Sequence, residues 1–213
     1  MSTDEWFRRT TWTDEDRTDF HAHLNRARKY NRPQYLRIQA SHLADVANHA
    51  AALELLDHFL QVDDGAIDLA QAHLQRAEAF LATGCEQEAI DAFRASLEAE
   101  RKRPNVQTEA WLLFPWFIVE TQETELYPEA NSILSEFSKL RSPSFPVSNY
   151  RFHCVMALLL ANTIDQAQAI SHAKQALAAS DEKHSGYRYH PNLGLVQDTN
   201  NTVHERIAII ADT

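Results

Sequence analysis

The chain has 213 residues, of which 44% are hydrophobic and 23% charged, with four Gly, seven Pro and two Cys. This composition is that of a folded globular protein, and so few Gly and Pro argue against a turn-rich β-sandwich. Two Cys are too few for a disulfide framework. The net charge of −10 repels nucleic-acid phosphates, so we expect no nucleic-acid partner.

The beginning of the sequence has no basic region followed by an apolar run, so we expect no secretory signal. The longest apolar run, residues 110–119, contains Pro115 and is far shorter than the roughly 20 residues of a membrane span. The sequence therefore predicts a cytoplasmic protein that does not associate with a membrane.

Residues 13–31 predict an N-terminal capping helix. Thr13 is a suitable N-cap, acidic residues follow it in the first turn, and Phe20 and Leu24 share one face. His21 and His23 are two residues apart and point in different directions on a helix, so we expect no metal site here.

Residues 70–103 predict two helices joined by a tight turn at Gly84. Apolar residues recur at helical spacing before the turn and again after it, and a connection this short makes the helices antiparallel. Similar units are expected in residues 33–66, 104–142 and 143–180. Each unit has Ala at the expected helix crossing, namely Ala52, Ala89, Ala130 and Ala169.

The run from Glu109 to Glu120 is apolar on every face, which is typical of a helix buried all round. Pro115 removes a backbone donor and predicts a kink or interruption. Two interpretations stay open: the aromatic residues belong to the core, or they line a ligand groove. These residues are Trp111, Phe114, Trp116 and Phe117.

The hairpin of residues 70–103 resembles the tetratricopeptide repeat (TPR). Ala77, Phe80, Ala89 and Phe93 stand at the family's small and aromatic positions, whereas His73 and Arg101 depart from its Trp and Pro. The resemblance covers residues 33–180. It implies an all-α, right-handed superhelix of three to four antiparallel hairpins. With the helices expected before and after the repeats, we predict a single domain over residues 1–213. It also implies a scaffold or adaptor that binds a protein or peptide in its concave groove.

By the family's offsets, the first helix of each hairpin supplies the groove residues. Arg37 alone fits the basic clamp that some members use for a terminal carboxylate, so we argue against that ligand. Between residues 38 and 100 the sequence has twelve acidic residues and only two basic ones, Arg76 and Arg94. This surplus of negative charge favours either a basic peptide ligand or an acidic surface that is simply solvated. The groove candidates are Arg37, Ser41, Ala44, Leu74, Glu78, Leu81, Cys154 and Leu158.

Residues 181–213 predict an extended loop and a C-terminal capping helix that carries Val203, Ile207 and Ile210 on one face. The loop, residues 185–196, has two interpretations. Its tyrosines and leucines cover the last hairpin, or Arg188 and His190 are presented as binding residues.

The sequence contains no Gly-rich phosphate loop, no paired-Cys motif and no HExxH. We therefore expect no enzyme activity, no catalytic residue, no cofactor and no bound metal. The alternative function is a structural or regulatory subunit that associates with itself, as in a homodimer. An enzyme of unknown chemistry is a third class, and it would require a ligand beside residues 111–117.

Overall fold

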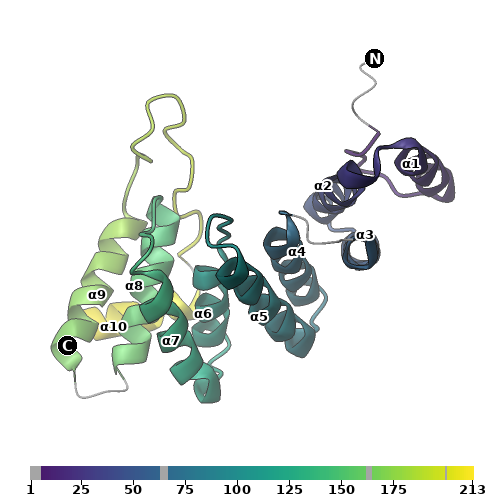
Figure 1. The fold of residues 1–213 in the computed structure, drawn as a ribbon. Helices are drawn as coiled ribbons and strands as arrows, with labels where there is room; N and C mark the ends of the chain where they lie inside the picture. The colour runs from purple at the N-terminus through teal and green to yellow at the C-terminus, as the bar shows by residue number, and fades with distance from the viewer. Residues whose placement is uncertain (1–5, 63–66, 162–164, 200) are drawn as a thin grey trace. The chain divides into compact units, whose positions relative to one another are not determined.

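The computed structural model describes residues 6–62, 67–161, 165–199 and 201–213, and in this part of the chain it holds ten α-helices and no strand (Figure 1). The expected all-α class is confirmed. The helices are α1 (Asp14–Arg26), α2 (Arg32–Asp45), α3 (His49–Val62), α4 (Leu69–Ala82), α5 (Glu86–Lys102), α6 (Ala110–Glu120), α7 (Tyr127–Phe137), α8 (Pro146–Ala161), α9 (Gln166–Ser180) and α10 (Thr202–Ala211).

The chain forms two compact units. Unit 1 is Met1–Ala110 and contains α1 to α5, and unit 2 is Trp111–Thr213 and contains α7 to α10 with nearly all of α6. A single domain over residues 1–213 stays a prediction. None of the helices in the described ranges combines the length and the apolar character that crossing a bilayer requires.

In unit 1 the segment before α1 is fixed onto α2 by a double hydrogen bond. The backbone N–H of Arg9 donates to Gln39 Oε1 at 2.9 Å, and Gln39 Nε2 donates to the Arg9 carbonyl at 2.7 Å. Trp6 and Phe7 pack on the Tyr35 ring, with centroids 4.9 and 4.7 Å away. Trp6 and Phe7, which have no helical spacing in the sequence, thus pack against α2.

Helix α1 begins as expected, with Thr13 and Asp16 forming a reciprocal capping box. The hydrogen bond from the Thr13 backbone, with others from side chains, holds the pKa of the Asp16 carboxyl well below its usual range. The predicted end at Asn31 is wrong, because α1 stops at Arg26. Arg32 donates to the carbonyls of Ala27 and Asn25 and so satisfies the end of α1 where the chain turns towards α2.

The two hairpins of unit 1 have the same turn. Gly84 has a φ of +75° between α4 and α5, as its sequence position predicts, and Ala47 has a φ of +60° between α2 and α3. The residue after each then donates to a carbonyl of the preceding helix: Asn48 N to Leu43 O at 2.8 Å, and Cys85 N to Phe80 O at 2.9 Å. These residues correspond at the 37-residue offset between Ala52 and Ala89.

Alanines fill the predicted helix-crossing positions in both units. Ala52, Ala89, Ala130 and Ala169 are at most 1% exposed. Ala40, Ala77 and Ala157 precede three of them by twelve residues and are equally buried. Small side chains therefore lie inside the pairs α2–α3, α4–α5 and α8–α9, whose helices pack on each other.

In unit 2, α6 runs through Pro115 without interruption, so an interruption is wrong and a kink stays a prediction. Trp111, Phe114 and Phe117 are at most 4% exposed, as the core interpretation of this run requires. The free energy gained by burying these large rings offsets the loss of the backbone hydrogen bond that Pro115 cannot donate. Trp116 is half-buried and lies 5.9 Å from the Tyr150 ring, at the start of α8.

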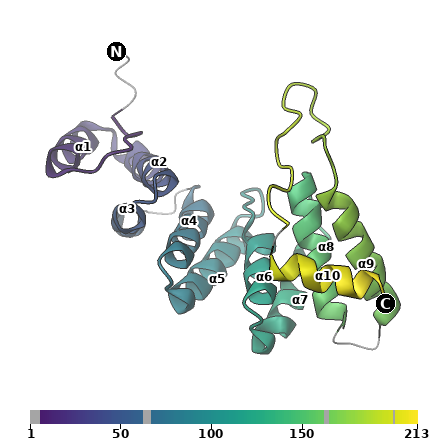
Figure 2. The ribbon, with the colours of Figure 1, turned by 180° about the vertical axis from the view of Figure 1, so that it is seen from behind.

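The C-terminal part of unit 2 follows the expected order of loop and helix. Residues 181–199 form a non-helical arm that projects beyond α8 and α9 (Figure 1). Helix α10 then packs on α8 and α9, and it lies on the side of these helices that faces the viewer in Figure 2. Val203 and Ile207 are fully buried, as expected, whereas Ala211 takes the buried place expected of Ile210.

Candidate peptide-binding surfaces

Six of the eight groove candidates lie in unit 1, on the first helices of its two hairpins. Arg37, Ser41 and Ala44 come from α2, and Leu74, Glu78 and Leu81 come from α4, which contacts α2. Glu78 is exposed, and Leu74 is 3% exposed. The other four are half-buried. The helices α2 and α4 therefore form a partly exposed surface with one buried member, which we call the α2–α4 face.

Arg37 is paired within the chain. Its Nε lies 3.3 Å from Asp68 Oδ1, and both side chains are largely buried. Asp68 is the residue before α4, so the ion pair connects α2 to the start of the next hairpin. An arginine already neutralised by a neighbouring carboxylate is a poor clamp for a second one. The pairing agrees with the argument against a terminal-carboxylate ligand.

A buried acceptor lies on α4 beside the candidate residues. Gln75 Oε1 has no hydrogen-bond partner among the described residues, although it is shielded from solvent. A buried acceptor in this state costs about 1–3 kcal/mol, because it has lost water and gained no donor. Gln75 is not among the groove candidates, although the family's offsets put it at one of the other clamp positions. Nothing in its sequence context signals the missing donor.

The acidic surplus of unit 1 is partly neutralised by ion pairs. Arg76 Nη2 lies 2.9 Å from Asp57, and Arg94 Nη1 lies 3.7 Å from Asp91. Glu100 is buried and accepts from the backbone and side chain of Thr108, so it serves the end of α5. Many of the remaining acids of this window, Glu78 included, lie at the surface.

The other two groove candidates, Cys154 and Leu158, lie on α8 in unit 2. They are 0% and 3% exposed, whereas a groove-lining role needs side chains that a ligand can reach. Burial raises the pKa of Cys154 to about 12, so its thiol is protonated and unreactive at neutral pH. Their neighbour Tyr150, one turn earlier, contacts His204 of α10, with its hydroxyl oxygen 3.2 Å from His204 Nδ1.

The tail candidates Arg188 and His190 are exposed on the projecting arm. The arm is held by its own hydrogen bonds: Ser185 Oγ donates to the His190 carbonyl at 2.6 Å, and Ser185 N donates to the Pro191 carbonyl at 2.7 Å. Tyr189 is 80% exposed, so it does not cover the last hairpin. Arg188 and His190 are therefore exposed on this loop, while Tyr187 packs on Phe145 with ring centroids 5.5 Å apart, and a binding role for Arg188 and His190 stays a prediction.

A pair of histidines joins α8 to α9. His153 Nδ1 and His172 Nδ1 are 2.8 Å apart, so one neutral ring donates to the other. Burial, with the neighbouring His172, lowers the pKa of His153 to about 4, and burial also lowers the pKa of His172. His153 borders an open polar hollow of about 430 Å³ beside the arm, which Asn149, Gln175, Glu182 and His184 also line.

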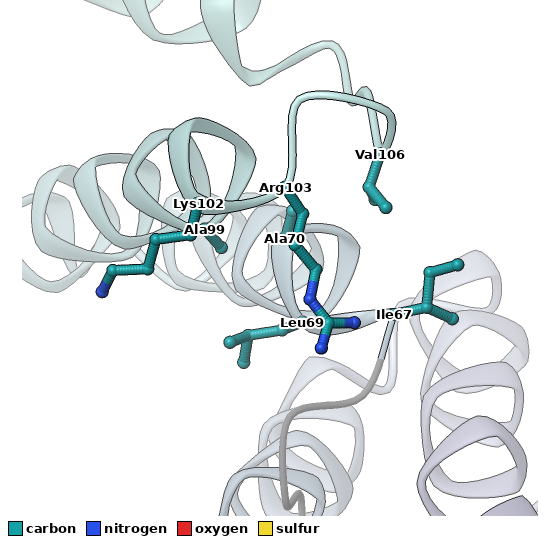
Figure 3. A pocket seen from close by; sticks show the side chains of 7 residues that line it. All are labelled: Ile67, Leu69, Ala70, Ala99, Lys102, Arg103 and Val106. Carbon is teal, nitrogen blue, oxygen red and sulfur yellow. The ribbon is translucent and has the colours of Figure 1, made fainter.

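Unit 1 contains a smaller, apolar cavity of about 170 Å³ (Figure 3). Figure 3 shows the Arg103 side chain extending between Leu69 and Ile67, while Lys102 points away. Sites for drug-sized ligands measure about 300–1,000 Å³, so this cavity suits only a small group. Its remaining lining residues are Ala70, Ala99 and Val106.

The histidines near the N-terminus have separate partners. His23 stacks on Trp6 with ring centroids 5.3 Å apart, whereas His21 lies 5.7 Å from the His58 ring. Across the ranges that the structure describes, no three His, Cys, Asp or Glu side chains gather in a way that could hold a metal ion.

Comparison with family models, with curated proteins and with solved structures finds no match for this chain.

Proposed function

We propose that the protein is a scaffold that binds a basic peptide or protein segment on the α2–α4 face of unit 1. In this proposal the hairpins continue into a right-handed, TPR-like superhelix, and the face forms part of its concave side. The observation that carries the proposal is Gln75 Oε1, a buried acceptor on α4 that has no partner among the described residues. Rotation of the half-exposed Gln75 side chain would bring this oxygen within reach of a donor from a ligand.

The charge of the face supports a basic ligand. Glu78 follows Gln75 by three residues, so the two lie on the same side of α4, and its carboxylate is exposed to solvent. Lysine and arginine side chains supply donors for both oxygen acceptors. The acidic surplus of residues 38–100 would also attract such a ligand over distances of about 10 Å.

A peptide library with net charges from strongly negative to strongly positive tests the proposal. The full-length protein should retain basic and mixed-charge peptides and discard acidic ones. Gln75→Leu removes the acceptor and keeps a similar side-chain volume, and it should weaken the binding of the retained peptides. Gln87→Leu, an exposed glutamine on α5, is the matched control and should leave their binding unchanged. Retention without regard to charge, or equal effects of both substitutions, would refute the proposal.

A further inference from the structure

The connection between α1 and α2 is strongly basic, although the chain as a whole has a net charge of −10. No acidic residue stands between Asp19 and Asp45. Residues 26–32, which we call the basic turn, contain four basic residues within this stretch, namely Arg26, Arg28, Lys29 and Arg32. Positive charge is thus concentrated in one short segment of unit 1.

The basic turn has a defined backbone. Lys29–Asn31 forms a single turn of 3₁₀-helix, and Asn31 N donates to the Arg28 carbonyl at 2.9 Å. At its end, half-buried Arg32 is used to close α1 through backbone carbonyls. Arg28 Nη1 also donates to the Tyr30 hydroxyl at 2.9 Å. The turn therefore presents its exposed side chains from a structured loop.

Three cations and one aromatic ring of the basic turn face solvent. Arg26, Arg28 and Lys29 are exposed, and Tyr30 is 71% exposed. Within the part of the chain that the structure describes, no carboxylate lies within 4.0 Å of these three cations. Arg and Tyr are among the residue types that contribute most to binding at protein interfaces. The turn thus offers an aromatic, positively charged surface to an acidic partner.

The other run of basic residues, residues 101–103, is less available to a partner. Arg101 and Lys102 lie 3.8 and 3.5 Å from the carboxylate of Glu98, which partly neutralises them. Arg103 extends along the apolar cavity of unit 1 (Figure 3). The basic turn is therefore the better candidate for an electrostatic contact.

The α2–α4 face has the opposite charge. Glu78 on α4 is exposed, and so is Asp45, which follows Ala44 at the end of α2. Guanidinium, ammonium and phenol groups donate hydrogen bonds, whereas carboxylates and the Gln75 amide oxygen accept them. The basic turn and the α2–α4 face are thus complementary in charge and in hydrogen bonding, and such complementarity steers association.

The basic turn and Asp45 of the same copy are too far apart to meet. The turn ends at the first residue of α2, and Asp45 is the last residue of this helix. A helix of 14 residues is about 21 Å long, which exceeds the reach of an arginine side chain. The complementary surface for the turn therefore belongs to another molecule.

We propose that the basic turn of one copy docks on the α2–α4 face of a second copy, with Arg28, Lys29 and Tyr30 opposite Asp45 and Glu78. This inference rests on the proposed function, because it names a second copy of the chain as the source of the basic segment. The contact joins two different surfaces, so each pair still has one turn and one face for further copies. Assembly is therefore head to tail, grows with protein concentration and weakens as salt rises.

Sedimentation velocity of the full chain at several protein and salt concentrations tests the proposal. The turn variant carries Arg28→Glu and Lys29→Glu, and the face variant carries Asp45→Lys and Glu78→Lys. We expect wild type to assemble at low salt and each variant to associate at least about tenfold more weakly. All of these changes replace exposed charges, so the variants should melt like wild type.

The control variant carries Lys183→Glu and Arg188→Glu, two exposed cations of the arm in unit 2. It changes the net charge by as much as the turn variant does, and it should assemble like wild type. If the control and turn variants lose assembly equally, net charge rather than the basic turn governs association and the proposal is wrong.

A mixture of the turn variant and the face variant tests the contact itself. The face variant keeps its basic turn and the turn variant keeps its α2–α4 face, so one productive contact remains and no third copy can add to it. We expect a 1:1 complex from two proteins that are each monomeric alone. A mixture that stays monomeric would overturn the proposal.

The failure of this inference differs from the failure of the proposed function. A wild-type chain that stays monomeric at low salt but binds basic library peptides would refute the inference and keep the proposed function. The proposed function fails by its own test, in which the library peptides are retained without regard to charge. If the basic turn captures a polyglutamate peptide while the copies stay apart, its partner is another acidic protein and the inference is wrong.

Discussion

At the scale of single residues, the turns of unit 1 require a positive φ, which glycine adopts more easily than alanine. Gly84 and Ala47 occupy corresponding turns with φ values of +75° and +60°. Gly adopts this region freely, whereas a residue with a Cβ pays about 1–2 kcal/mol to enter it. Gly84 was recognised in the sequence, but Ala47 gave no signal because alanine at the same place looks like a helix former.

The first prediction concerns Ala47. Ala47→Gly should raise the free energy of unfolding of unit 1 by about 0.5–1 kcal/mol. Glycine relieves the strain at this turn, and part of that gain is lost because glycine has more conformational entropy in the unfolded chain. Chemical denaturation measures the change. The control is Ala50→Gly, in the first turn of α3, which should destabilise instead. A loss of stability in Ala47→Gly would contradict the strain at this turn.

At the scale of elements, small residues determine how closely paired helices approach. Ala89 is 0% exposed and lies where α5 meets α4. A larger side chain has no space there, because protein interiors are packed as densely as organic crystals.

We predict that Ala89→Leu lowers the free energy of unfolding by about 1–3 kcal/mol, since it overpacks the helix crossing. Exposed Ala82→Leu, at the end of α4, should change stability little. Thermal melts of both variants give the comparison. If Ala89→Leu melts within about a degree of wild type, the proposed register of the hairpins is wrong.

The histidine pair between α8 and α9 makes unit 2 sensitive to acid. Both folded-state pKa values lie below the unfolded value, so the folded unit binds fewer protons than the unfolded chain. The stabilisation is complete above about pH 6.5 and is lost as the pH falls towards the His153 pKa of about 4. Phe152, which packs edge-on against both rings, helps to exclude water from the pair.

The free energy of unfolding should therefore fall between pH 6.5 and 4, and it should fall less steeply in His153→Gln, which keeps a polar side chain that does not titrate. Denaturation at a series of pH values measures both slopes. The exposed His184→Gln serves as the control and should keep the wild-type slope. Equal slopes in wild type and His153→Gln would show that the pair is not the acid-sensitive group.

The elements that sequence reasoning located best are those with helical periodicity and distinctive caps. The N-cap at Thr13, the turn at Gly84 and the buried alanines were all readable, because each follows from local backbone needs. The contact of His153 with His172 was not, since it depends on the antiparallel pairing of α8 and α9. The position of α10 was also beyond local rules, because an arm of 19 described residues separates it from α9.

At the scale of the whole molecule, the two units expose different amounts of the predicted binding surface. The α2–α4 face of unit 1 is partly open, whereas Cys154 and Leu158, the candidates on α8 of unit 2, are buried. The family resemblance placed candidates on both surfaces by sequence offset alone. It could not account for burial, which depends on how the helices pack in three dimensions.

The most direct test of the proposed function is the titration of a basic peptide, selected from the library, against two charge-reversal variants at two salt concentrations. Glu78→Lys reverses an exposed acid on the α2–α4 face, and Glu88→Lys reverses an exposed acid at the start of α5. Single exposed charges contribute little to folding, so both variants should melt like wild type. We expect Glu78→Lys alone to weaken binding by about tenfold at low salt, and the difference to shrink at high salt as screening grows. Equal binding by Glu78→Lys and Glu88→Lys at both salt concentrations would contradict the proposal that the α2–α4 face binds the peptide.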